Sequence, residues 1–207
     1  MQHSAGSGKS NTIAWLAHHL SNLHDDEQRV VFDSIIVITD RRVLDKQLQD
    51  TVFSMDHTAG VVVKVDKNAR QLTEALGRGA RIIISTLQKF PFVDVSNIAT
   101  AGKHFAVIVD EAHSSQSGSA AKQLKELLVD VDLDPAEEIS ADDFLAAKDS
   151  AIAASANITF VALTATPKGK TLRLFGTQVG DRWEAFDTYT MAQAIEEGFI
   201  LDVLTNY

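Results

Sequence analysis

The stretch His3–Ser10, which reads HSAGSGKS, decides the fold of this chain. It matches the phosphate-binding pattern G-x-x-x-x-G-K-[ST], except that His3 stands in place of the first glycine. Gly6 and Gly8 allow the backbone to turn tightly and to present its N–H groups to phosphate oxygens. The positive end of a helix that starts near Lys9 would add to this attraction. The stretch therefore predicts a phosphate-binding loop that leads into a helix.

Each side chain of this loop has an expected task. Lys9 can reach the β- and γ-phosphates of a nucleotide, and Ser10 offers a hydroxyl to Mg²⁺. The alternative is a flexible loop without function, and the amphipathic helical pattern that follows counts against it. The residues expected to bind ATP are Ser4, Ala5, Gly6, Ser7, Gly8, Lys9 and Ser10.

Further along the chain, short apolar runs rich in β-branched residues alternate with helical patterns. Such runs indicate strands that are buried on both faces, as parallel strands are. Their alternation with helices predicts an α/β fold with a mostly parallel central sheet between two layers of helices. The expected strands are Ser34–Thr39, Val61–Val65, Arg81–Thr86, Phe105–Asp110 and Ile158–Thr164. Two expected helix faces are formed by Ile13, Leu16, Ala17 and Leu20, and by Val43, Leu44 and Leu48 after an N-cap at Asp40.

A second candidate site follows the run FAVIVD, where Asp110, Glu111 and His113 lie within the string DEAH. An acidic residue at the carboxyl end of a buried strand suits a Mg²⁺ ligand, and Asp110 is expected in that role. Glu111 is expected to polarise the attacking water. Since ligands of open α/β sheets bind at the carboxyl ends of strands, these residues can face the phosphate-binding loop. The alternative is a surface turn that carries ordinary acids.

The third candidate is the string TATP, which closes the last expected strand. The hydroxyls of Thr164 and Thr166 would lie beside the same cleft and could bond to His113 or Glu111. Taken alone, the string also fits an ordinary turn begun by Thr-Pro.

Composition bounds the class of protein. The chain of 207 residues has a net charge of −9 and no cysteine, so disulfides and thiolate metal sites are excluded. Nine acids against two lysines in residues 125–149 account for most of that charge, and we expect this segment to lie away from DNA. No apolar run is long enough to cross a membrane, and the opening does not resemble a signal peptide. Trp15 and Trp183 are expected to pack in the interior.

In this order, the loop, DEAH and TATP resemble motifs I, II and III of superfamily 2 helicases. Longer strings resemble the motor (R) subunit of bacterial type I restriction enzymes, whose members also resemble this chain at His3. These strings are VITDRRVLDKQ at Val37–Gln47, ISTLQKF at Ile84–Phe90, DEAHSSQSG at Asp110–Gly118 and YTMAQAIEEGFI at Tyr189–Ile200.

The resemblance implies a RecA-like lobe that uses ATP and Mg²⁺ to move double-stranded DNA before cleavage. The implied catalytic residues are Lys9, Asp110, Glu111 and His113, with Ser10 and Asp110 as Mg²⁺ ligands and Thr164 and Thr166 in coupling. The implied DNA contacts are Arg41, Arg42, Ser85, Thr86 and Gln88, and the two arginines fit a solvated helix turn equally well.

The resemblance also implies an organisation and partners. Residues 1–207 would form one lobe without its first strand, with an acidic insertion at 125–155 and the start of a connection to a second lobe at 185–207. The partners would be that lobe and the methyltransferase and specificity subunits, in a bacterial cytoplasm. Without the arginine that the second lobe supplies, residues 1–207 alone should hydrolyse ATP negligibly. Two alternatives stay open: another superfamily 2 DNA helicase or type III restriction subunit, and an unrelated P-loop ATPase or kinase.

Overall fold

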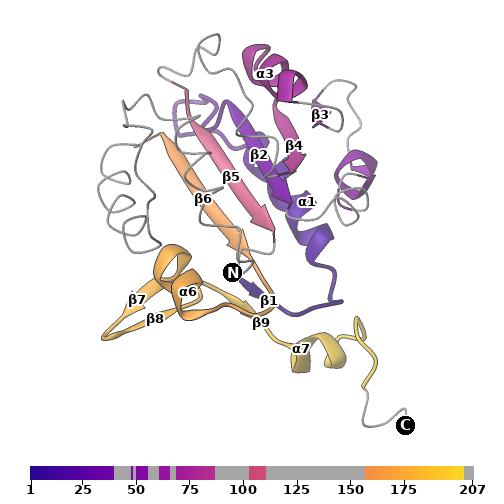
Figure 1. The fold of residues 1–207 in the computed structure, drawn as a ribbon, viewed down its shortest axis with the longest axis vertical. Helices are drawn as coiled ribbons and strands as arrows, with labels where there is room; N and C mark the ends of the chain where they lie inside the picture. The colour runs from indigo at the N-terminus through magenta and orange to yellow at the C-terminus, as the bar shows by residue number, and fades with distance from the viewer. Residues whose placement is uncertain are drawn as a thin grey trace.

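A five-stranded parallel sheet forms the centre of the computed structural model, which describes residues 1–39, 48, 50–55, 61–65, 69–86, 103–110 and 157–202 (Figure 1). The strand order is β3-β4-β2-β5-β6, and every neighbouring pair is parallel. The strands span Ser34–Thr39 (β2), Val62–Val65 (β3), Ile82–Thr86 (β4), Phe105–Asp110 (β5) and Ile158–Leu163 (β6). These bounds agree with the apolar runs of the sequence to within one residue.

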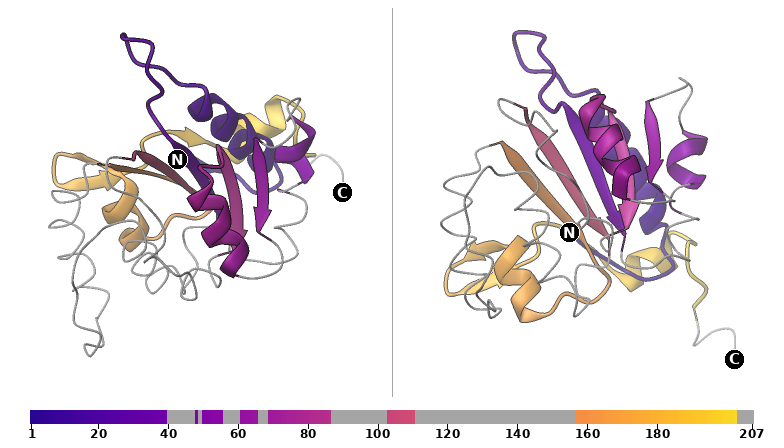
Figure 2. Two further views of the ribbon diagram at one scale, coloured as in Figure 1. Left: turned by 90° about the horizontal axis from the view of Figure 1, so that it is seen from above. Right: turned by 45° about the horizontal axis from the view of Figure 1, so that its top comes forward.

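Helices cover both faces of this sheet (Figure 2). Helix α1 (Lys9–Ser21) packs Ile13 and Ala17 with Ile35 of β2, whereas α3 (Ala69–Gly77) packs Leu72 and Leu76 with residues on the opposite side of the same strand. Because successive residues of a strand point to opposite faces, the two helices lie on different sides of the sheet. The predicted α/β fold with a mostly parallel central sheet is confirmed.

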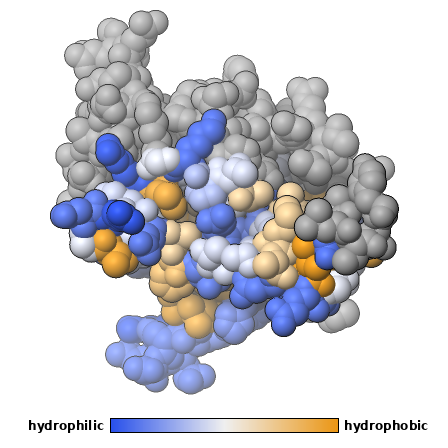
Figure 3. Space-filling view, turned by 90° about the horizontal axis from the view of Figure 1, so that it is seen from below, coloured by the Kyte–Doolittle hydropathy of each residue, from blue (hydrophilic) through white to orange (hydrophobic). Residues whose placement is uncertain are grey.

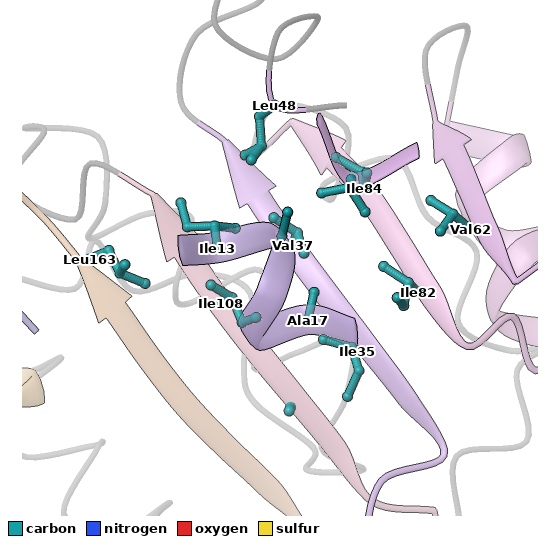
Figure 4. Packing of buried hydrophobic residues seen from close by; sticks show 13 residues of the cluster. Ile13, Ala17, Ile35, Val37, Leu48, Val62, Ile82, Ile84, Ile108 and Leu163 are labelled. Atoms are coloured by element: carbon teal, nitrogen blue, oxygen red, sulfur yellow. The ribbon is translucent and has the colours of Figure 1, made fainter. Parts of the chain in front are cut away.

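The middle strand shows why the sheet must be covered on both faces. All six residues of β2 are buried. Ile35 and Val37 lie in the cluster beneath α1, which Figure 4 shows from close by. Ile36 and Ile38 lie in the cluster beneath α3. The continuous apolar run of the sequence is thus divided between two cores by the period of the strand.

The residues just before the phosphate-binding loop form a short strand, β1 (Gln2–His3). It pairs in parallel with β9 (Thr188–Tyr189), and Gln2 also forms a parallel bridge with Thr164 at the end of β6. The sequence led us to expect no strand at this point. Backbone hydrogen bonds from both neighbours nevertheless hold β1 in place, so β1 and β9 form a separate two-stranded sheet that the bridge to Thr164 joins to the end of β6.

After β6 the chain forms smaller elements. Helix α6 (Gly169–Phe175) is followed by an antiparallel hairpin of β7 (Thr177–Val179) and β8 (Arg182–Glu184), and β9 leads into α7 (Met191–Glu196). The predicted connection at 185–207 includes β9 and α7, and its role stays a prediction. The predicted acidic insertion at 125–155 lies outside the described residues.

The expectation that both tryptophans pack in the interior is wrong. Trp15 is 65% exposed on α1, so it is not a packing residue of the core, and Trp183 is 38% exposed. In the view from below, apolar areas are set among hydrophilic ones (Figure 3). Among the described helices, none is both long and apolar enough to cross a membrane.

Candidate nucleotide-binding site

The glycine-rich loop connects β1 to α1 and depends on its glycines for its shape. Gly6 and Gly8 have φ angles of 75° and 86°, which are values that favour glycine. Gly8 is also the N-cap of α1 and carries no side chain that could cap the helix. The loop therefore brings the N-terminus of a 13-residue helix to the carboxyl edge of the sheet, as anion binding requires.

The structure brings the two main predicted site residues together. Lys9, at the start of α1, and Asp110, at the end of β5, form an ion pair with 3.3 Å between Nζ and Oδ1. Their side chains are only 13% and 9% exposed. Attraction between such charges is strong where water is scarce. Residues 101 positions apart in the sequence thus meet where a nucleotide phosphate and its metal ion would bind.

The donor atoms at this point suit Mg²⁺. The carboxylate of Asp110 and the hydroxyl of Ser10, which follows Lys9 directly in α1, are hard oxygen ligands, the type that Mg²⁺ prefers. No nitrogen or sulfur ligand is needed. When bound, the ion would neutralise phosphate charge, while Lys9 would move from Asp110 to the phosphates. The assignment of these roles remains a prediction.

Thr164, one of the two predicted coupling residues, lies against the strand that enters the loop. It is 2% exposed, and its carbonyl oxygen accepts a hydrogen bond of 2.9 Å from the backbone N–H of His3. Its own hydroxyl oxygen accepts a bond of 3.4 Å from the N–H of Thr166, whose side chain is exposed. A shift of the TATP segment would therefore act directly on the base of the loop.

The described DNA-binding candidates lie at the carboxyl end of β4. Ser85 and Thr86 are 0% and 3% exposed, and the Ser85 hydroxyl donates a hydrogen bond of 3.3 Å to the Thr86 carbonyl oxygen. They stand at the same edge of the sheet as Asp110 because both strands are parallel to β2. Their contact with DNA stays a prediction. The candidates Arg41, Arg42, Gln88, Glu111 and His113 lie outside the described residues.

The structure adds a buried network at His3 that sequence reasoning missed. The imidazole Nδ1 lies 2.9 Å from the Ser7 hydroxyl oxygen, and Nε2 lies 3.1 Å from the Thr12 hydroxyl oxygen. Ser4 completes the network, because its hydroxyl donates to Ser7 at 2.9 Å and its carbonyl oxygen accepts from Ser7 at 2.6 Å. The unusual residue at the first position of the pattern was the signal that could have revealed this network.

The hydrogen bonds indicate which imidazole nitrogen of His3 carries the hydrogen. Ser7 has one hydroxyl hydrogen, and it is donated to the Ser4 carbonyl. Nδ1 must therefore donate to Ser7, and its second neighbour at 3.4 Å, the Ser4 carbonyl oxygen, can only accept. Nε2 is then the acceptor for Thr12. Burial lowers the pKa of His3 below its usual value, and the nearby charge of Lys9 acts in the same direction.

This fold and this site define a nucleotide-binding lobe of the RecA type: a parallel sheet, a glycine-rich loop before a helix, and a Lys–Asp pair at the carboxyl edge. The chain belongs to the SWI2/SNF2 ATPase family, whose sequence model matches residues 1–133. It is therefore a helicase-like ATPase. The comparison with curated proteins gave no match.

Two solved structures are similar to the chain. A nuclease-deletion mutant of the type ISP restriction-modification enzyme LlaGI, in complex with a DNA substrate mimic, is 14% identical with a TM-score of 0.54, and the match covers 96% of this chain and 18% of that one. The UvsW helicase from bacteriophage T4 is 14% identical with a TM-score of 0.47, and the match covers 84% of this chain and 49% of that one. The chain thus spans at most about half the length of these proteins, and the LlaGI similarity supports the fold alone.

Proposed function

We propose that this chain is the first motor lobe of the R subunit of a type I restriction enzyme, which hydrolyses ATP to pull double-stranded DNA. The observation that carries the proposal is the ion pair between Lys9 and Asp110, since it joins the phosphate-binding loop to the predicted metal ligand. In such an arrangement Lys9 holds the β- and γ-phosphates, Asp110 and Ser10 hold Mg²⁺, and Glu111 polarises water. His113 completes the catalytic set, and Thr164 and Thr166 of TATP couple ATP hydrolysis to the DNA-binding residues.

The strings that extend beyond the helicase motifs support the R subunit in particular. Tyr189–Ile200 and Asp110–Gly118 resemble that subunit more specifically than a loop and an acidic strand end do. The similarity to LlaGI, a type ISP restriction-modification enzyme in complex with a DNA substrate mimic, is compatible with a restriction-enzyme relative. The partners would be duplex DNA, a second lobe, and methyltransferase and specificity subunits in the bacterial cytoplasm.

A second candidate is another superfamily 2 DNA motor, such as a type III restriction subunit. The family match favours it equally, since it identifies a SWI2/SNF2 ATPase without naming a restriction system. The same match counts against an unrelated P-loop kinase. Co-purification with methyltransferase and specificity subunits separates the two DNA motors, because only the type I enzyme needs both.

The test uses DNA translocation by the full-length enzyme with its partner subunits. Lys9→Ala should abolish translocation, because one preorganised charge at a transferring phosphoryl group contributes about 10²–10³ in rate. Lys103→Ala is the matched control, since Lys103 precedes the opposite end of β5, away from the loop. Translocation by Lys9→Ala at the parent rate would refute the site. ATP hydrolysis that needs neither DNA nor the partner subunits would refute the hypothesis that this chain belongs to the motor of a restriction enzyme.

A further inference from the structure

One segment of the chain, Thr188–Ile200, contacts the phosphate-binding loop at several points, and we call it the strap. It consists of β9, α7 and the turn that follows, and β9 lies beside β1 (Figure 1). The backbone N–H of Ser4 donates a hydrogen bond of 3.0 Å to the Tyr189 carbonyl. At the other end of the strap, a Cβ atom built on Gly6 would lie 4.0 Å from Ile200 Cγ1. The strap is therefore hydrogen-bonded to the base of the loop and lies close to its tip.

The strap also meets the network beneath the loop. The Tyr189 ring packs against the His3 ring, with 5.0 Å between centroids and 49° between planes. That distance lies within the range of favourable aromatic contacts. His3 in turn donates from Nδ1 to Ser7, in the middle of the loop. The Tyr189 ring therefore contacts the same imidazole that bonds to Ser7.

Hydrogen bonds at both ends make the strap a rigid unit. A capping box joins Thr190 and Gln193 at the start of α7. At its end, the N–H groups of Phe199 and Ile200 both donate to the Ala194 carbonyl. The Tyr189 hydroxyl spans the helix by donating to Glu197 Oε2 at 2.7 Å, and this bond raises the pKa of Tyr189 to about 12. Movement of one end of the strap is therefore transmitted to the other.

We propose that the strap positions the phosphate-binding loop for nucleotide, with Tyr189 as a positioning residue that acts through His3 on Ser7. The proposal rests on the proposed function only in that the loop binds ATP. Coupling of this kind is reciprocal, so nucleotide in the loop stabilises the strap as much as the strap stabilises the bound nucleotide.

The first experiment measures the affinity of the full-length protein for a non-hydrolysable Mg²⁺–ATP analogue. Tyr189→Leu and His3→Ala should each weaken binding about three- to tenfold, the effect of losing one or two hydrogen bonds or ring contacts. The amide nitrogen of His3→Asn can replace Nδ1 as the donor to Ser7 but cannot form the ring contact with Tyr189, so this variant should bind more tightly than His3→Ala and more weakly than the parent. His3→Gln reaches toward Thr12 instead and should bind as weakly as His3→Ala.

Two further measurements separate positioning from a structural role. Hydrogen exchange at the amides of Ala194, Phe199 and Ile200 should slow when the analogue binds to the parent, and this response should be lost in Tyr189→Leu. Thermal unfolding shows whether each variant is folded at the assay temperature. Glu74→Gln is the matched control, because Glu74 forms a solvent-exposed ion pair with Arg70 on α3. This variant should change neither the affinity for the analogue nor the hydrogen exchange of the strap.

Each outcome decides the proposal. Equal affinity of Tyr189→Leu and the parent overturns it, and so does equally weak binding by His3→Asn and His3→Gln. Unchanged exchange of the strap on binding also overturns it, even if affinities fall. Lys9→Ala distinguishes the two hypotheses: if Lys9→Ala binds the analogue as the parent does, the nucleotide site itself is misassigned. If Lys9→Ala loses binding while Tyr189→Leu keeps it, only the role of the strap is wrong.

Discussion

The interior of the sheet and its carboxyl edge are built from different residues although the same strands form both. In the interior, β2 contributes Ile35, Ile36, Val37 and Ile38, which are at most 2% exposed. At and beside the edge, many of the buried side chains are polar. They are His3, Ser4, Ser7, Thr39, Ser85, Thr86, Asp110 and Thr164.

This difference in polarity shows that the interior of the sheet serves stability, whereas its carboxyl edge serves ligand binding. Burial of apolar side chains is favourable on its own, at about 25 cal/mol per Å². A buried polar group is costly unless it finds a partner. The edge meets this requirement with short-range networks, such as the bonds of His3 to Ser7 and Thr12 and the ion pair of Lys9. Such groups gather where a ligand needs them, which is at the carboxyl ends of the strands.

The largest expected effect comes from the edge. Glu111→Gln keeps the shape of the side chain but removes the charge that polarises water, so hydrolysis in the full-length enzyme should fall about 10²–10⁴-fold while ATP binding is kept. Asp110→Asn should instead weaken Mg²⁺-dependent binding itself. Glu111→Gln should not lower the unfolding temperature much, whereas Asp110→Asn should lower it because it removes the charge that pairs with the buried Lys9. Hydrolysis by Glu111→Gln at the parent rate would show that Glu111 is not catalytic.

The next largest effect is expected in the interior of the sheet, where a substitution should change stability but not nucleotide binding. Ile36 is fully buried beneath α3, and Ile36→Ala should lower the free energy of unfolding by about 2–5 kcal/mol because it leaves a cavity. Urea unfolding measures this change. Affinity for the ATP analogue, measured where the variant is still folded, should stay at the parent value. A loss of affinity as large as that of His3→Ala would mean that the two regions are not separable.

A smaller effect is expected on the stability of the protein at low pH. The pKa of His3 is lowered in the folded protein by burial, so the unfolded chain binds the proton more readily. The stability contributed by the neutral imidazole is therefore complete above the unfolded pKa of about 6.5 and is lost as the pH falls below it. His3→Asn should lose less stability than the parent as the pH falls below about 6.5. His19→Asn on the exposed face of α1 is the control, and an equal response of both variants would contradict this role of His3.

The smallest effect is expected at the surface. Trp15 is 65% exposed, so Trp15→Ala should change the free energy of unfolding by no more than about 0.5 kcal/mol. Chemical denaturation is again the measurement. A loss of 2 kcal/mol or more would show that the ring is covered in solution and would restore the packing role that the sequence suggested.

Much of the fold followed from local patterns. Runs such as SIIVIT and RIIIST predicted buried strands, because a strand covered on both faces is apolar at successive positions and these runs are short and rich in β-branched residues. The loop HSAGSGKS predicted the start of a helix directly after it, and its glycines have the left-handed φ angles that the motif requires. The sequence failed at β1, since two residues carry no periodicity and their pairing partners lie more than 150 positions away.

The sequence by itself therefore determined which residues could bind phosphate and metal, because glycine, lysine, serine and aspartate at these spacings have intrinsic chemistry. Only the tertiary structure decided that Lys9 meets Asp110 at 3.3 Å, that His3 holds Ser7, and that Tyr189 supports His3. The physical reason is that parallel strands bring their carboxyl ends to one edge whatever their distance along the chain. Pattern reading captures neighbours in sequence, whereas the site consists of neighbours across the sheet.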